Sequence, residues 1–150
     1  MCLSRVDLHT KHIRTGYKVV WKESRYGLFP DGATDVYFPE CRDSNKPLPL
    51  NKWLSEEDYR TSNSVGGMSF NSIQCTNQDK LYPTGFHTFV TQQGAKSWQA
   101  VGSTSTTVIV KVKVKDCVAS GYQRCGLRWH RLAFYRTVVA KRIKIVEVLP

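Results

Sequence analysis

The sequence predicts an α+β protein, organised as one domain with a mostly antiparallel β-sheet and a few short helices. Three observations lead to this prediction. Residues 106–116 ("TTVIVKVKVKD") alternate between two faces, which is the period of a β-strand. One face contains Val108, Val110, Val112 and Val114, and the other contains Ile109, Lys111, Lys113 and Lys115. Further strand-like segments occur near both ends of the chain, whereas the helical segments are short. The length of 150 residues is typical of one domain with its own core.

The first half of the chain predicts strands separated by turns. Residues 16–22 ("GYKVVWK") alternate as a half-buried strand, and residues 23–35 are rich in Gly, Pro and Asp, which favours turns. Residues 36–40 ("VYFPE") predict a short strand that its proline confines to a sheet edge. Residues 41–80 predict a long loop or insertion within the domain, interrupted by a short helix that Ser55 caps.

The second half predicts strands around a single helix. Residues 85–90 ("GFHTFV") alternate as a strand, and residues 91–101 ("TQQGAKSWQAV") predict a helix of about two turns with Thr91 at its N-cap. Residues 118–131 ("VASGYQRCGLRWHR") contain two glycines and several cations and predict a loop. The β-branched residues of 136–150 predict a final strand.

The charge is distributed unevenly along the chain. The net charge is +10, and residues 101–150 contain 10 basic against 2 acidic residues. Residues 1–100 are nearly balanced, with 12 basic and 10 acidic residues. A concentrated positive field attracts polyanions, so the expected partners are nucleic acid or an acidic protein surface. Basic residues can equally form the solvated face of a strand, and the sequence leaves this alternative open.

A set of cations with an interleaved aromatic residue forms the candidate polyanion-binding site. Phosphates bind to cationic side chains, and bases stack on aromatic rings. Trp129 can also pack inward at the edge of a core, which is the alternative to a stacking role. The candidate residues are Lys111, Lys113, Lys115, Arg124, Arg128, Trp129 and Arg131, and His130 lies among them.

His87 is the candidate catalytic residue. It follows a Pro-Thr-Gly turn and lies between two phenylalanines in a predicted strand. A neutral imidazole can donate and accept hydrogen bonds and can transfer a proton. The alternative is that His87 is a packing residue, because the sequence supplies no adjacent partner for catalysis.

Several classes of site and location are not supported by the sequence. Cys117, Cys125 and His130 lack the close ligand pairs of a structural zinc site, so no metal is expected. An odd number of cysteines without a CxxC pair favours reduced thiols. The sequence contains no apolar run of the kind that a membrane span or a secretory signal requires. We therefore expect a cytoplasmic protein without membrane association.

The order of the segments "GYKVV", "GFHTF", "AKSW", "VIVKVKV" and "TVVAKRIKIVEVL" resembles the ADP-ribosyltransferase superfamily. The chain also resembles small phage and prophage proteins of unknown function that begin with Met-Cys-Leu-Ser and share a Gly-Phe-His-x-Phe motif. The first resemblance implies NAD as a cofactor and a nucleotide pocket. It places Lys18 where one branch has an arginine and His87 where another has a tyrosine that stacks on nicotinamide. The implied pocket residues are Tyr17, Lys18, His87 and Thr88.

This chain departs from the family pattern at its catalytic position. The superfamily has a glutamate near the start of the last strand, where this sequence has Arg136 and Thr137, and Glu147 lies too near the strand end to replace it. The missing carboxylate would stabilise the positive charge that develops as nicotinamide leaves. We therefore favour a small basic accessory or binding protein, plausibly phage-encoded, that engages its partner through the C-terminal third and needs no cofactor. The alternatives are an altered ADP-ribosyltransferase-like enzyme that uses NAD and a virion-associated structural protein.

Overall fold

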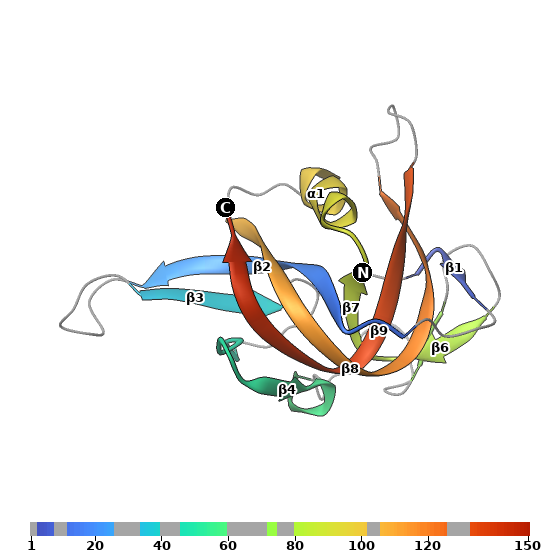
Figure 1. The fold of residues 1–150 in the computed structure, drawn as a ribbon, viewed down its shortest axis with the longest axis horizontal. Coiled ribbons are helices and arrows are strands. Elements are labelled where there is room, and N and C mark those ends of the chain that lie inside the picture. Colours follow the sequence, from blue (N-terminus) through green and yellow to red (C-terminus); the bar gives the residue numbers. More distant parts are fainter. Residues whose placement is uncertain are drawn as a thin grey trace.

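Two long strands near the C-terminus, β8 and β9, form the framework of the computed structural model (Figure 1). The structure describes residues 3–7, 12–25, 34–39, 46–59, 72–74, 80–101, 106–125 and 133–150, with the backbone alone for 25, 34 and 72–74. The strands are β1 (Arg5–Val6), β2 (Thr15–Arg25), β3 (Thr34–Pro39), β4 (Trp53–Ser55), β5 (Ser72–Gln74), β6 (Leu81–Pro83), β7 (Phe86–Phe89), β8 (Thr107–Cys125) and β9 (Ala133–Leu149). The helices are the 3-10 helix η1 (Glu56–Tyr59) and α1 (Gln92–Val101).

The predicted class is confirmed, because the fold is a mostly antiparallel sheet with short helices. Seven strands form one sheet in the order β1-β8-β2-β7-β9-β4, with β3 paired to β2, and β5 and β6 pair separately. β8 also pairs with β9, so the pairings β8-β2-β7-β9 close a ring. The ladder between β8 and β9 contains two register shifts. Such bulges bend strands, and both strands curve strongly in Figure 1.

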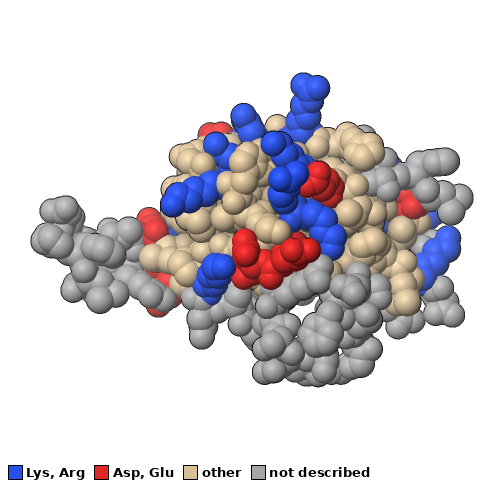
Figure 2. Space-filling view, turned by 90° about the horizontal axis from the view of Figure 1, so that it is seen from below, with Lys and Arg blue, Asp and Glu red and all other residues tan. Residues whose placement is uncertain are grey.

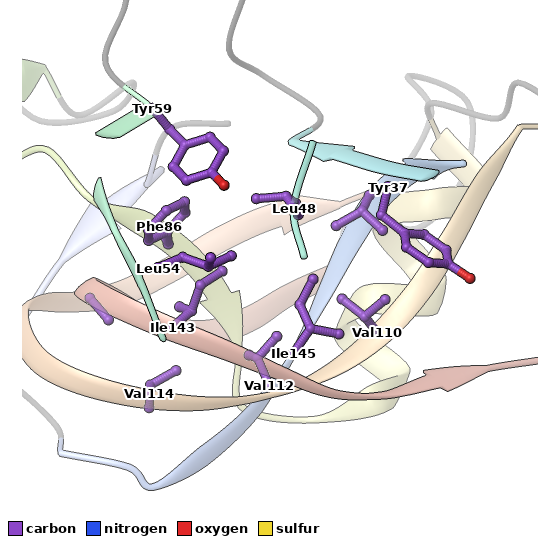
Figure 3. Packing of buried hydrophobic residues seen from close by; sticks show 12 residues of the cluster. Tyr37, Leu48, Leu54, Tyr59, Phe86, Val110, Val112, Val114, Ile143 and Ile145 are labelled. Carbon is purple, nitrogen blue, oxygen red and sulfur yellow. The ribbon is translucent and has the colours of Figure 1, made fainter. Parts of the chain in front are cut away.

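Apolar residues fill both sides of this curved sheet. The largest cluster lies on the side of β4, where Leu54 packs with Tyr59, Phe86 and Ile143 (Figure 3). A second cluster lies under α1, which is on the other side of the sheet from β4 in Figure 1. Thr91 caps α1 through a hydrogen bond of 3.3 Å from the Gly94 N–H to its Oγ1, as predicted. Burial of both faces explains why apolar side chains point to either side of the sheet.

The N-terminal segment is fastened to the far half of β8. β1 pairs with residues 121–122, and Leu3 is completely buried against Tyr82, Ala119 and Val139. Arg136 of β9 forms an ion pair of 2.6 Å with Asp7. This docking brings Leu3 against Tyr82, whose hydroxyl lies 3.0 Å from the Nε2 of His87 on β7.

Four expectations from the sequence need correction. The predicted turns over 23–35 are in part strand, because β2 continues to Arg25 and β3 begins at Thr34 to form a hairpin. The middle of β2 is buried on both faces rather than on one, since Lys18, Val19 and Val20 are all buried.

The other two corrections concern predicted loops. The loop expected over 118–131 is strand as far as Cys125, and residues 126–131 lie outside the described part. The described part of 41–80 contains β4, η1 and β5, with Leu48, Leu54 and Tyr59 in the main core. Residues 46–59 are therefore packed against the sheet rather than forming a loop throughout, and the short helix predicted there is η1. Residues 41–45, 60–71 and 75–79 lie outside the described part, so the predicted insertion stays a prediction there.

Candidate functional site

The four residues predicted to line a nucleotide pocket lie on two opposite faces of the sheet. Tyr17 is directly opposite Phe89, and His87, two residues away on β7, shares that face. Lys18 and Thr88 occupy the other face, because a Cβ added to Gly16, two residues before Lys18, would overlap the Thr88 methyl group. A ligand on one face of the sheet would therefore contact at most two of the four side chains.

His87 is buried and connects β7 to the N-terminal segment. His87 is only 5% exposed, and its Nε2 atom lies 3.0 Å from the Tyr82 hydroxyl. That hydroxyl accepts a hydrogen bond of 2.7 Å from the backbone N–H of Leu3. The two rings meet edge to face with centroids 5.7 Å apart. These contacts are those of a packing residue, the alternative that the sequence left open, and a catalytic role for His87 stays a prediction.

The buried polar groups on the other face serve the strand contact between β2 and β7. The ammonium group of Lys18 donates a hydrogen bond of 3.3 Å to the backbone carbonyl of His87. The Thr88 hydroxyl is buried and has no hydrogen-bond partner within the described residues. Lys18 therefore satisfies a backbone oxygen at a place where β2 and β7 share a single residue pair.

The predicted lysines project from one face of β8. Lys113 and Lys115 are exposed and Lys111 is half-buried, whereas Val112 and Val114 point into the main core. Ile109, predicted on the lysine face, is buried under α1. Arg124 is exposed near the other end of β8. Arg128, Trp129, His130 and Arg131 lie outside the described residues, so their predicted role stays a prediction.

β9 and β4 add cations and an aromatic ring to the same face. Lys144 lies directly opposite Lys113 in the ladder, and Arg142 lies opposite Lys115. Trp53 of β4 lies opposite Lys144 on the other side of β9 and is 40% exposed. Residues that pair across antiparallel strands project to the same side. We define the basic face as Lys111, Lys113, Lys115, Arg142, Lys144 and Trp53.

Acidic residues neutralise only part of the basic face. Lys111 lies 3.6 Å from Glu147, and the Arg142 guanidinium donates a hydrogen bond of 2.5 Å to Asp116. That hydrogen bond lowers the pKa of Asp116 and raises the pKa of Arg142. Lys113 and Lys144 have no ion pair with any described residue, although they face each other. Figure 2, seen from the side on which β4 lies in Figure 1, shows many basic side chains gathered beside a smaller acidic group.

The sequence contained a signal for two of the missed residues. Arg142 and Lys144 alternate with Ile143 and Ile145, the same pattern that identified the lysines of β8. Extending the charge analysis to the last strand would have found them. Trp53 gives no such signal, because its position depends on the pairing of β4 with a strand about 90 residues later in the chain.

The two described cysteines, Cys117 and Cys125, are free thiols. Burial raises the pKa of the Cys125 thiol to about 11, and Cys117 is a half-buried free thiol. Within the described residues, no group of three or more His, Cys, Asp or Glu side chains is close enough to hold a metal ion. None of the described helices is long and apolar enough to cross a membrane. Comparisons with family models, curated protein sequences and solved structures gave no match.

Proposed function

We propose that this protein is a binding protein that engages a polyanion, with nucleic acid as the expected partner, through the basic face. The observation that supports this most directly is the Lys113–Lys144 pair, two lysines that lie opposite each other in the ladder and have no ion pair with any described residue. Like charges directly opposite in a sheet are destabilising. A bound phosphate between them would remove that repulsion and supply the missing negative charge.

The position of the basic face supports the same proposal. Its cations project from strands whose other sides are fixed in the main core by Val112, Val114, Ile143 and Ile145. Side chains on rigid strands keep their relative positions, which preserves the spacing that repeating phosphates require. The face also belongs to the C-terminal third, where the excess of positive charge is concentrated.

A charge-removal experiment tests the proposal. We would measure the affinity of the Lys113→Gln/Lys144→Gln variant for a labelled oligonucleotide by fluorescence anisotropy over a range of salt concentrations. If both lysines contact phosphates, the slope of log K against log salt becomes shallower by up to about 1.8 on duplex DNA. Relief of the repulsion keeps the folding stability unchanged or raises it by a few tenths of a kcal/mol. Lost binding therefore cannot be attributed to unfolding.

The matched control removes the same charge elsewhere. Lys80 and Lys96 are exposed and lie outside the basic face, so Lys80→Gln/Lys96→Gln changes the net charge equally. The proposal expects this control to retain most of the affinity and the original salt slope. Equal loss in both double variants would show that the overall charge, not the basic face, determines binding. Absence of binding at low salt by the unmodified protein would refute the proposal.

The NAD-utilising, ADP-ribosyltransferase-like alternative is the weaker candidate. Its proposed pocket residues occupy opposite faces of the sheet, and the His87 ring contacts Tyr82 in the core. Its catalytic glutamate also has no counterpart in the sequence. A rise in melting temperature with NAD that His87→Ala abolishes would restore this alternative. The phage origin and the virion-associated alternative stay predictions, since no described contact favours them.

A further inference from the structure

Trp53 is an exposed aromatic ring held at a fixed position on the basic face. The next residue, Leu54, is buried in the main core, and both residues pair with β9. Trp53 therefore cannot turn inward without loss of the β4 pairing and of the Leu54 contacts. An apolar ring kept in solvent beside cations is available for contact with a partner.

The cations around Trp53 are arranged to hold the phosphates of a stacked nucleotide. Lys144 is its direct cross-strand neighbour, and the ammonium group of Lys115 lies 4.4 Å from the ring centroid. The Lys115 contact is a cation–π interaction in which the ammonium group lies over one face of the ring, so a base would stack on the opposite face. A nucleotide whose base stacks on the ring would thus have its phosphates within reach of Lys144 and Lys115.

The size of the basic face suits a single strand of nucleic acid rather than a duplex. Trp53, Lys144 and Lys113 lie on three adjacent strands, a span of about 10 Å, and Lys115 with Arg142 forms a second row about 7 Å away. Within a duplex the faces of the bases are covered by their neighbours, so Trp53 would add nothing to duplex binding. An unpaired base has a free face for the ring.

We infer that the basic face binds single-stranded nucleic acid, with an unpaired base stacked on Trp53 and neighbouring phosphates on Lys144, Lys113 and Lys115. The inference rests on the proposed function and specifies its ligand. Stacking on one aromatic ring tolerates any base, so we expect little sequence preference.

The test compares a labelled single strand with a duplex of the same sequence and length. We would measure anisotropy for the unmodified protein and for Trp53→Leu, which keeps an apolar side chain but removes the π face. We expect Trp53→Leu to weaken single-strand binding by about fivefold or more and to leave duplex binding unchanged. Trp53→Phe, which retains a ring, should recover part of the loss.

Trp21→Leu is the matched control. Trp21 is 37% exposed on β2 and lies opposite Thr107, at the other end of the β2–β8 ladder from Lys113. We expect it to retain full single-strand affinity. Tryptophan fluorescence gives a second readout, because the quenching by a single strand should be unchanged in Trp21→Leu and weaker in Trp53→Leu.

The failures of the two proposals are distinguishable. Equal affinities for single strand and duplex, unaffected by Trp53→Leu but reduced by Lys113→Gln/Lys144→Gln, would overturn the single-strand inference and retain the polyanion proposal. The absence of oligonucleotide binding at low salt would overturn both. Equal loss from Trp53→Leu and Trp21→Leu would show that Trp53 has no special role and would also overturn the inference.

Discussion

Gly121 permits the N-terminal strand to dock on β8, and its replacement gives a quantitative test of that docking. A Cβ at this position would overlap the backbone oxygen of Arg5, the residue before the one that pairs with Gly121. The backbone at Gly121 is not in the left-handed region, so alanine itself is compatible with the strand. The three atoms nearest to the added Cβ all belong to β1, and the simplest response is that β1 leaves its place.

The cost of Gly121→Ala is limited by the free energy that docking contributes. The hydrogen bonds of residues 3–7 to Tyr82, Ser120 and Tyr122 are offset by the entropy of ordering those residues. Burial of the Leu3 side chain, which is completely inaccessible, then provides the net stabilisation of about 1.5–3 kcal/mol. We expect the substitution to lower the free energy of unfolding by about 2 kcal/mol.

Urea unfolding of four proteins checks this reasoning. They are the intact chain and a chain lacking residues 1–7, each with and without the substitution Gly121→Ala. In the shortened chain the added methyl group meets no β1, so Gly121→Ala should be neutral or stabilising by about 0.5–1 kcal/mol. The sign of the effect should thus differ between the two backgrounds. An equal destabilisation in both would refute the assignment of the cost to β1.

Two further predictions concern buried side chains. Tyr82→Phe removes the hydroxyl that joins the Leu3 N–H to His87, and we expect a loss of about 1–3 kcal/mol in urea unfolding. Tyr59→Phe, which removes one hydrogen bond to a carbonyl, should cost less, and a reversed order would contradict this account. Because burial raises the pKa of Cys125 to about 11, its thiol should resist iodoacetamide at a pH of about 8 in the native protein and react after unfolding in urea. Peptide mass spectrometry measures both states, and rapid native labelling would refute the burial.

Alternation of side chains was sufficient to predict the strands whose two faces differ in polarity. The valines and lysines of β8 show a period of two, and the structure places them as expected. The isoleucines and cations of β9 show the same period, although it was not used to predict their positions. The Thr91 cap likewise depends on local contacts, so the start of α1 was predictable. These features need no knowledge of distant segments.

The features that were not predicted depend on contacts between distant segments. Gly121 favours a turn in the sequence, but in the fold it allows the close approach of β1 within a continuous strand. Lys18 fits a solvent-facing position by alternation, yet both faces of β2 are covered and its ammonium group bonds to the His87 carbonyl. Trp53 joins the basic face only because β4 pairs with β9. Local patterns carry no information about such partners.

Two neighbouring rows of the basic face, one with opposite charges and one with like charges, can be compared directly. One row along the same two strands, Lys111 lies opposite Glu147, a pairing of opposite charges that stabilises the sheet. The fold therefore accepts a glutamate opposite a lysine on this surface. The next row pairs Lys113 with Lys144, at a cost in stability that the sheet geometry does not require. Departures from such local preferences, here two like charges in opposite positions, are expected at functional sites. The Lys113–Lys144 pair lies next to Trp53. The proposed anionic ligand would bind between these two lysines and remove their repulsion.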